Sequence, residues 1–239
     1  MASTLVLFQV SSLVALIGMS LGWRGIMTKY SGFYDLPTAW SMVFWGILVG
    51  GFYGKLADSF LLLPYLKGEG LVFSNLLICL VLAVTVHLML RRNRVRKTGS
   101  QSTTGWALGL AVGGMVGMFF IFRILERYDL SIEIVASVTL VALISPRAHA
   151  LIFCHHGHGM LMDMRWKVVL RTFIWCSLLI TTLYSAFFYP LAWIFIIPVL
   201  LLAEKQAPKW VWAAIPKPAR RRLRRIWADA ARSKSSEEE

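Results

Sequence analysis

The sequence predicts an all-α bundle embedded in a membrane, with about seven transmembrane helices and a basic amphipathic helix after them. Hydrophobic residues make up 57% of the 239 residues and charged residues only 15%, whereas about a quarter of the residues in soluble domains are charged. The mean hydropathy is +0.64. The apolar residues form long continuous runs, which are typical of helices surrounded by lipid.

Seven apolar runs are candidate spans, and a total of five to eight spans is compatible with the pattern. The first run lacks the positively charged region of a signal peptide, so we expect it to be a retained helix. Pro146 and Arg147 interrupt the fifth run, and Tyr189 and Pro190 separate the last two runs by a tight turn or a kink. The predicted spans are 4–23, 36–56, 71–90, 104–123, 131–151, 168–188 and 190–204.

Glycines at intervals of four residues mark the helix faces that we expect to pack together. The pattern G-x-x-V-G-G-x-x-G occurs at 46–54 and again at 109–117, which also suggests an internal duplication. In lipid the hydrophobic effect does not drive helices together, so small residues that allow close backbone approach indicate contact faces. A hinge or a pore lining is the alternative role. The expected packing residues are Gly18, Gly22, Gly46, Gly50, Gly54, Gly105, Gly109, Gly113 and Gly117.

The basic residues predict which side of the membrane each loop occupies. Segment 91–97 carries five Lys or Arg residues, and seven spans place it on the same side as 24–35, 147–167 and the chain from Lys205 onward. Short loops rich in Lys and Arg stay in the cytoplasm. We therefore expect the N-terminus outside and the C-terminus in the cytoplasm, in a bacterial or archaeal cytoplasmic membrane.

The composition changes near residue 207, which divides the chain into a transmembrane bundle, 1–206, and a basic tail with an acidic end, 207–239. Leu223 and Trp227 fall on one helical face of the tail and are surrounded by arginines, as in helices that lie on anionic membranes. We expect anionic lipids and protein partners to bind this side, rather than nucleic acid. The candidate binding residues are Arg91, Arg92, Arg94, Arg220, Arg221, Arg222, Arg224, Arg225 and Trp227.

Four histidines fall within 147–167, the segment that we expect to be a cytoplasmic loop, and His87 lies near the same side. Imidazole, thiolate and carboxylate groups bind zinc, copper or iron. The spacing matches no single metal motif, so three interpretations stay open: a plain interfacial loop, a transition-metal or haem site, and a pH sensor. The candidate ligands are His149, Cys154, His155, His156, His158 and Asp163.

A second polar group is expected on the opposite side of the membrane, at the ends of the second, fourth and fifth spans. Acidic residues inside a membrane are candidates for substrate or proton sites, although groups this close to the interface can also be solvated. The residues of this candidate polar site are Asp58, Arg123, Glu126 and Glu133.

The sequence contains no Walker loop, no GxSxG, no HExxH and no dinucleotide fingerprint. We therefore expect a non-enzymatic integral subunit or scaffold of a membrane complex, which docks partners on its basic cytoplasmic face. One alternative is a small channel or transporter. Another is a metal- or haem-binding membrane enzyme that uses the histidine loop.

Overall fold

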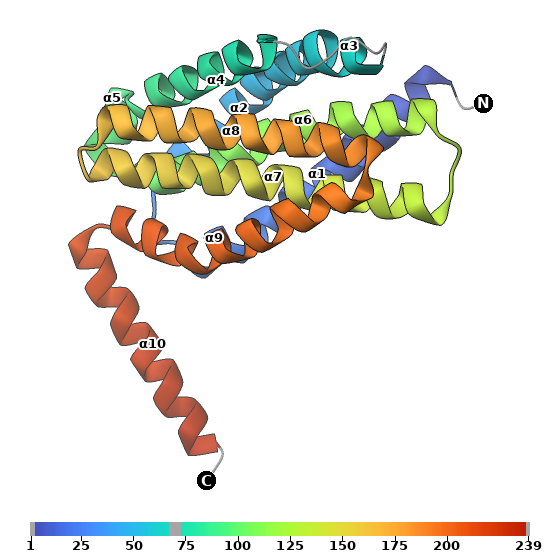
Figure 1. Ribbon diagram of the computed structural model, residues 1–239. Helices are drawn as coiled ribbons and strands as arrows, with labels where there is room; N and C mark the ends of the chain where they lie inside the picture. The colour runs from blue at the N-terminus through green and yellow to red at the C-terminus, as the bar shows by residue number, and fades with distance from the viewer. Residues whose placement is uncertain (1–2, 67–72, 238–239) are drawn as a thin grey trace.

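The computed structural model describes residues 3–66 and 73–237, and this part of the chain consists of helices and short connections without a strand. The all-α fold class is thereby confirmed. All the long helices but the last lie side by side in a bundle (Figure 1). The elements are α1 (Thr4–Lys29), α2 (Leu36–Ala57), the π-helix η1 (Asp58–Leu62), α3 (Leu63–Leu66), α4 (Ser74–Leu90), α5 (Asn93–Thr98), α6 (Gln101–Arg127), α7 (Ile132–Leu161), α8 (Arg165–Phe188), the 3-10 turn η2 (Pro190–Ala192), α9 (Trp193–Ala214) and α10 (Lys217–Glu237).

Five helices of the described chain are long and apolar enough to cross a membrane: α1, α2 together with η1, α6, α7 and α8. The third predicted span corresponds to α4, which is apolar but has only 17 residues. Its first two predicted positions, 71 and 72, lie outside the described residues. The seventh corresponds to α9, which contains two prolines and continues into a charged segment. A count of seven spans therefore stays a prediction.

The connections alternate between the two ends of the bundle. The N-terminus and the α6–α7 connection lie at one end, whereas α5, the α7–α8 connection and the junction of α9 with α10 lie at the other (Figure 1). We call the second of these the basic end, because it carries the arginines of α5, Arg165 at the start of α8 and the basic residues of α10.

Several helices begin or end where the sequence supplies a suitable cap. The side chains of Ser3, Asp35 and Ser131 accept hydrogen bonds from backbone N–H groups in the first turns of α1, α2 and α7. Such bonds satisfy donors that have no partner within the helix. At the end of α5, Gly99 adopts a left-handed conformation with φ of 64°, which favours glycine.

The prediction that a span ends near residue 151 and a loop follows is wrong, because α7 continues through Pro146 to Leu161. A proline inside a helix deprives the carbonyl four residues earlier of its backbone donor, here the carbonyl of Ala142. Gly18 of α1 lies against this oxygen so closely that a Cβ atom would overlap it. Close Cα–H···O contacts are weakly stabilising, and neighbouring helices commonly accommodate prolines in this way in membranes.

α6 is the most buried of the five long helices and contacts α1, α2, α7 and α9. Its glycines meet the backbone of α7: a Cβ atom at Gly109 would overlap the carbonyl oxygen of His149. The glycines one turn before and after make the equivalent contact. These pairs are Gly105 with the carbonyl of Phe153, and Gly113 with the carbonyl of Ser145.

α2 and α1 also approach α6 through glycines. A Cβ atom at Gly50 would lie 2.6 Å from the Cα atom of Val112, and Gly46 and Gly54 face α6 one turn to either side. Gly22 of α1 faces the side chain of Leu110. Gly117 differs from the others, because a Cβ atom there would make only ordinary van der Waals contact with α7. The core of the bundle therefore consists of α6 in close contact with three neighbours.

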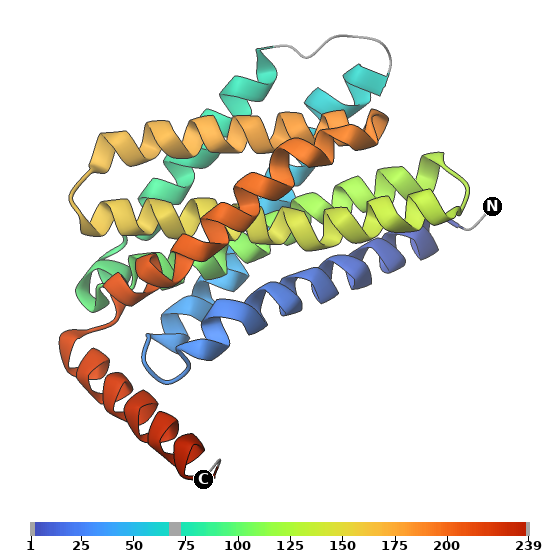
Figure 2. The ribbon, with the colours of Figure 1, turned by 60° about the horizontal axis from the view of Figure 1, so that its bottom comes forward.

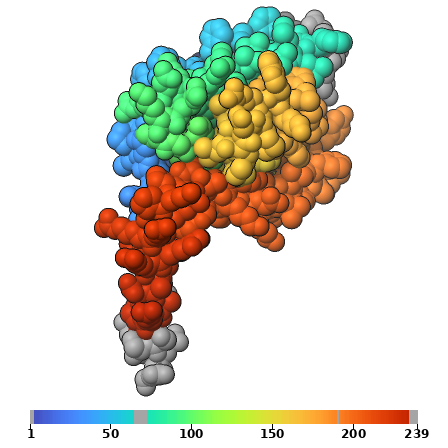
Figure 3. All heavy atoms as spheres, turned by 90° about the vertical axis from the view of Figure 1, so that its left-hand side faces the viewer, coloured from blue at the N-terminus to red at the C-terminus, as the bar shows by residue number. Residues whose placement is uncertain are grey.

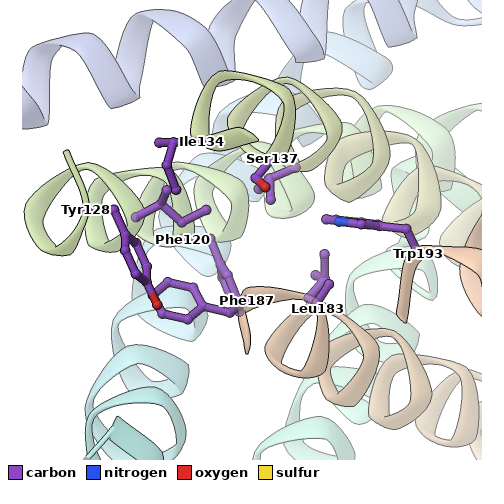
Figure 4. A pocket seen from close by; sticks show the side chains of 10 residues that line it. Phe120, Tyr128, Ile134, Ser137, Leu183, Phe187 and Trp193 are labelled. Carbon is purple, nitrogen blue, oxygen red and sulfur yellow. The ribbon is translucent and has the colours of Figure 1, made fainter. Parts of the chain in front are cut away.

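A cavity of about 20 Å³ lies between α6, α7 and α8 at the end opposite the basic end. The rings of Phe120, Tyr128 and Phe187 lie on one side of it and the indole of Trp193 on the other (Figure 4). This volume is enough for about one water molecule. The side chains of this region are therefore closely packed.

The junction between the bundle and the tail lies further along the chain than residue 207, which falls inside α9. The chain changes direction at Ile215 and Pro216, between α9 and α10. α10 then leaves the basic end and points away from the bundle (Figures 2 and 3).

Substitution of Gly109 by alanine should destabilise the bundle by about 1–3 kcal/mol, because the new Cβ atom would force α6 and α7 apart. The matched control is Gly25→Ala in α1, where a Cβ atom meets nothing within 4 Å. This change should stabilise the protein by about 1 kcal/mol, since alanine has the higher helix propensity. Denaturant unfolding in detergent measures both, and effects of the same sign would contradict the described packing.

Candidate functional site

A hydrogen-bonded chain of three side chains connects α4, α7 and α8 near the basic end. Nδ1 of His87 lies 3.1 Å from Nε2 of His156, and Nδ1 of His156 lies 2.7 Å from the Oγ1 atom of Thr172. One imidazole must donate and the other accept in the bond between the rings. His156 is buried and His87 is partly exposed. The arrangement can therefore transfer a proton between the edge of α4 and the interior.

The remaining histidines do not join this chain. A ring nitrogen of buried His149 lies 2.9 Å from the carbonyl oxygen of Ser145, and the ring of His155 stacks on Trp210 with centroids 4.3 Å apart. His149 and His155 both lie on the continuous helix α7. Six residues separate them by about 9 Å along the helix axis, which is too far for two ligands of one ion.

The predicted metal ligands are thus distributed along α7 and its end. Cys154 is buried, His158 is partly exposed, and Asp163 is exposed in the turn after α7, with Arg165 Nε 3.1 Å from its Oδ1 atom. Within residues 3–66 and 73–237, no three His, Cys, Asp or Glu side chains form a group that could hold a metal ion. The expectation of a histidine loop fails because this segment is helical.

At the opposite end, the structure brings together three of the four residues of the candidate polar site. Arg123 of α6 binds Asp58 of η1 through two parallel hydrogen bonds, from Nε to Oδ1 at 2.7 Å and from Nη2 to Oδ2 at 2.9 Å. The Asp58 carboxylate is buried, and Arg123 also binds Glu126 on its own helix. Glu133 is exposed in the first turn of α7. The cluster is therefore an ion-paired link between α2 and α6.

The buried aspartate opens a π-helical turn that the sequence pattern did not predict. In η1 each turn is wider than in an α-helix, which frequently marks functional positions in membrane and soluble proteins. The carbonyl oxygen of Ala57, immediately before η1, accepts a hydrogen bond from the hydroxyl group of Tyr184 at 2.8 Å. Tyr184 thereby connects α8 to the same end of α2.

The candidate binding surface at the basic end has two parts. Arg91, Arg92 and Arg94 are exposed between α4 and α6, with the guanidinium of Arg92 4.9 Å from the ring centroid of Trp45. The second part is α10. In its first turn, Arg220 donates hydrogen bonds to the carbonyl oxygens of Ile215 and Ala213 at the end of α9. The residues Arg221, Arg222, Arg224 and Arg225 are exposed along α10.

Aromatic rings hold α10 against the bundle. Trp227 stacks on Trp212 of α9 with ring centroids 5.7 Å apart, and Tyr30 lies 6.3 Å from Trp227. Leu223 is buried in the same contact. Because these side chains and Arg220 fix the first half of α10, its direction relative to the bundle is defined.

Sequence reasoning missed Thr172 and Arg171 as members of the polar groups. The hydroxyl of Thr172 completes the histidine chain, and Arg171 donates from Nη2 to the carbonyl oxygen of His155 at 3.1 Å. Both lie near the start of α8, and a basic or hydroxyl residue inside an apolar run is the only sequence signal. Their partners lie on another helix, so that signal does not identify them.

A comparison of the chain with family models, curated proteins and solved structures finds no match. The class that the fold and the polar groups define is an all-α bundle with several helices apolar and long enough for insertion into a membrane. Polar side chains gather near its two ends. The particular function must therefore be inferred from the geometry of this chain.

Removal of the buried charge at Asp58 should be costly. Asp58→Asn leaves Arg123 without its bidentate partner, and we expect a loss of about 3–5 kcal/mol in the free energy of unfolding. The control is Glu126→Gln, which removes the more exposed partner of the same arginine and should cost about 1 kcal/mol or less. Equal losses in a detergent unfolding assay would show that the buried pair has no special role.

Substitution of Thr172 by valine should destabilise the protein by about 1–3 kcal/mol, because Nδ1 of buried His156 loses its partner. Thr139→Val is a matched control, since the Thr139 hydroxyl is exposed and bonds only within α7; its effect should stay within about 0.5 kcal/mol. The same unfolding assay distinguishes the two. A small effect of Thr172→Val would mean that the histidine chain does not hold α8.

Proposed function

We propose that this protein is a non-enzymatic integral subunit or scaffold of a membrane assembly. Its bundle lies in a bacterial or archaeal cytoplasmic membrane, with the N-terminus outside and the basic end in the cytoplasm. There, α10 and the arginines around α5 bind anionic lipid and partner proteins. The observation that carries this proposal is the fixed position of α10 at the basic end.

The distribution of charge supports the orientation. The connections at the basic end carry the arginines at 91–96, the residues Arg165 and Lys167, and the cations of α10. At the opposite end, Arg123 pairs with Asp58 and Glu126, Lys55 pairs with Asp58, and Arg127 is exposed. Segments rich in Lys and Arg remain on the cytoplasmic side, and the basic end carries more of these residues, which favours it as the cytoplasmic end.

The geometry of α10 supports a docking role. Its first half contacts α9 and Tyr30, and Arg221, Arg222, Arg224 and Arg225 are exposed. Ile226 and Trp227 remain 45% and 40% exposed. A helix with exposed arginines and exposed apolar side chains suits the boundary between headgroups and acyl chains.

The glycine contacts support a scaffold more than a pore. Gly50 lies against the backbone of α6 and Gly113 against that of α7. Leucine at either position would separate helices, so a loss of flux in such variants would not distinguish a channel from a damaged bundle. The metal- or haem-binding alternative has no structural support of this kind, because the described residues contain no group of three or more ligating side chains.

The docking role of α10 can be measured with a fluorophore on Ala230→Cys, because the native cysteines are buried. In nanodiscs, replacing phosphatidylcholine by phosphatidylglycerol should shift its emission to the blue. Changing Arg221, Arg222 and Arg225 together to Gln should reduce the free energy of partitioning of α10 onto phosphatidylglycerol by about 3 kcal/mol. The partition coefficient then falls roughly a hundredfold, and the blue shift becomes smaller. The control is Arg127→Gln, which removes an exposed charge from the opposite end of the bundle and should leave the emission unchanged.

The scaffold role requires a partner. When the full chain is extracted from its own membrane in mild detergent, we expect a stoichiometric complex that dissociates in the α10 triple variant and persists in the Arg127→Gln control. A monomer at native expression level, together with unchanged fluorophore emission, would contradict both parts of the proposal.

A further inference from the structure

A lateral groove separates α8 from α9. Figure 2 shows α9, in orange, beginning beside α8 and diverging from it towards the basic end, and α7 contacts both helices. The groove has a volume of about 430 Å³, which is within the range of about 300–1,000 Å³ for small-molecule sites. Its walls are mostly apolar and include Leu151, Trp175, Leu178, Phe195 and Val199.

The groove is apolar along most of its length and polar at the basic end. Phe195 is 76% exposed and belongs to the first turn of α9, away from that end. His155, Gln206 and Trp210 line the groove nearer the basic end, where His155 stacks on Trp210. An occupant of this groove must therefore have a long apolar part and a polar head directed to the basic end.

The guanidinium of Arg171 lies beside the polar end of the groove, against the backbone of His155. Arg171 precedes Trp175 by one turn of α8, so both side chains are on the groove face of that helix. Its Nη2 atom donates to the carbonyl oxygen of His155, a residue of the groove wall. A Cβ atom at Gly159 would lie 3.1 Å from this nitrogen, so the absence of a side chain there leaves room for the guanidinium.

The charge of Arg171 has no carboxylate partner in the described part of the chain. The nearby acids are engaged elsewhere: Asp163 pairs with Arg165, and Glu204 pairs with Arg147. Arg171 is partly buried within an apolar helix, where an uncompensated cation is unfavourable. The planar guanidinium matches the oxygens of a phosphate group, which it can bind through two hydrogen bonds.

We propose that this groove binds one anionic membrane phospholipid. An acyl chain lies between α7, α8 and α9, and the phosphate group binds Arg171 at the basic end, beside His155 and Gln206. The charge complementarity at Arg171 selects an anionic lipid over a purely apolar molecule. This site does not involve α10, so it is independent of the docking role proposed above.

Native mass spectrometry of the full-length protein in detergent, titrated with phosphatidylglycerol or phosphatidylcholine, tests the proposal. We expect one phosphatidylglycerol per chain, bound more tightly than phosphatidylcholine. Arg171→Gln should weaken its binding roughly tenfold. Ala203→Phe, which fills the groove from α9, should also reduce it. Arg127→Gln removes the same charge from the exposed last turn of α6, at the end opposite the basic end and outside the groove, and should leave the affinity unchanged.

Several results would overturn the proposal. Equal binding of the two lipids would show that the site does not select an anionic headgroup, and unchanged binding by Arg171→Gln would show that the guanidinium does not hold the headgroup. Competition by millimolar inorganic phosphate as effective as that by the lipid would show an anion site without a role for the groove. Loss of lipid only in the α10 triple variant would place the lipid on the tail. Circular dichroism confirms that each variant is folded, so that loss of binding is not loss of structure.

Discussion

The close contact between α6 and α7 is the interaction on which the rest of the bundle depends. Lipid provides no hydrophobic drive for helix association, so van der Waals contact between backbones must supply much of the attraction. Gly105, Gly109 and Gly113 allow it by exposing the backbone of α6 to carbonyl oxygens of α7. The contact also gives Ser145 access to the carbonyl of Gly113, to which its hydroxyl donates at 2.7 Å. Glycine in a helix interior is destabilising in water. In lipid, the close backbone contact that it allows offsets this cost.

The peripheral helices are held by a different means. α4 and α8 have no glycine within their bounds, and hydrogen bonds between side chains join them to each other and to the core. The Asn75 amide donates to the Thr181 hydroxyl at 3.1 Å, and the chain from His87 through His156 to Thr172 links both helices to α7. Buried polar groups stabilise only when they have partners. The interior thus combines a central set of glycine contacts with a few satisfied polar links around it.

The apolar runs were sufficient to predict the all-α class, because a continuous apolar run of that length forms few structures other than a helix. The histidine segment was predicted wrongly as a loop because its polar side chains end the apolar run near residue 151, whereas α7 continues to Leu161. The carbonyl group that Pro146 leaves without a donor lies against Gly18, which is distant in the sequence, and no local pattern reveals this contact. The same limit applies to the polar groups. The sequence places His156 and Thr172 in neighbouring segments, but their pairing depends on the rotation of α8 about its axis. Arg123 and Asp58 could be placed at the same end, whereas their bidentate geometry could not.

α9 connects the two proposed binding features, because its last turns contribute to both. Trp210 and Gln206 form part of the groove wall, whereas Trp212, two residues after Trp210, stacks on Trp227 of α10. Successive residues of a helix point in different directions, so one short segment can face the groove and the tail together. Arg220 also ties α10 to the carbonyl groups at the end of α9. A displacement of α9 relative to α8 would therefore change the width of the groove and the direction of α10 at once. In a closely packed core such displacements are discrete rather than gradual, and the glycine-packed helices α6 and α7 supply the fixed frame against which α9 would move.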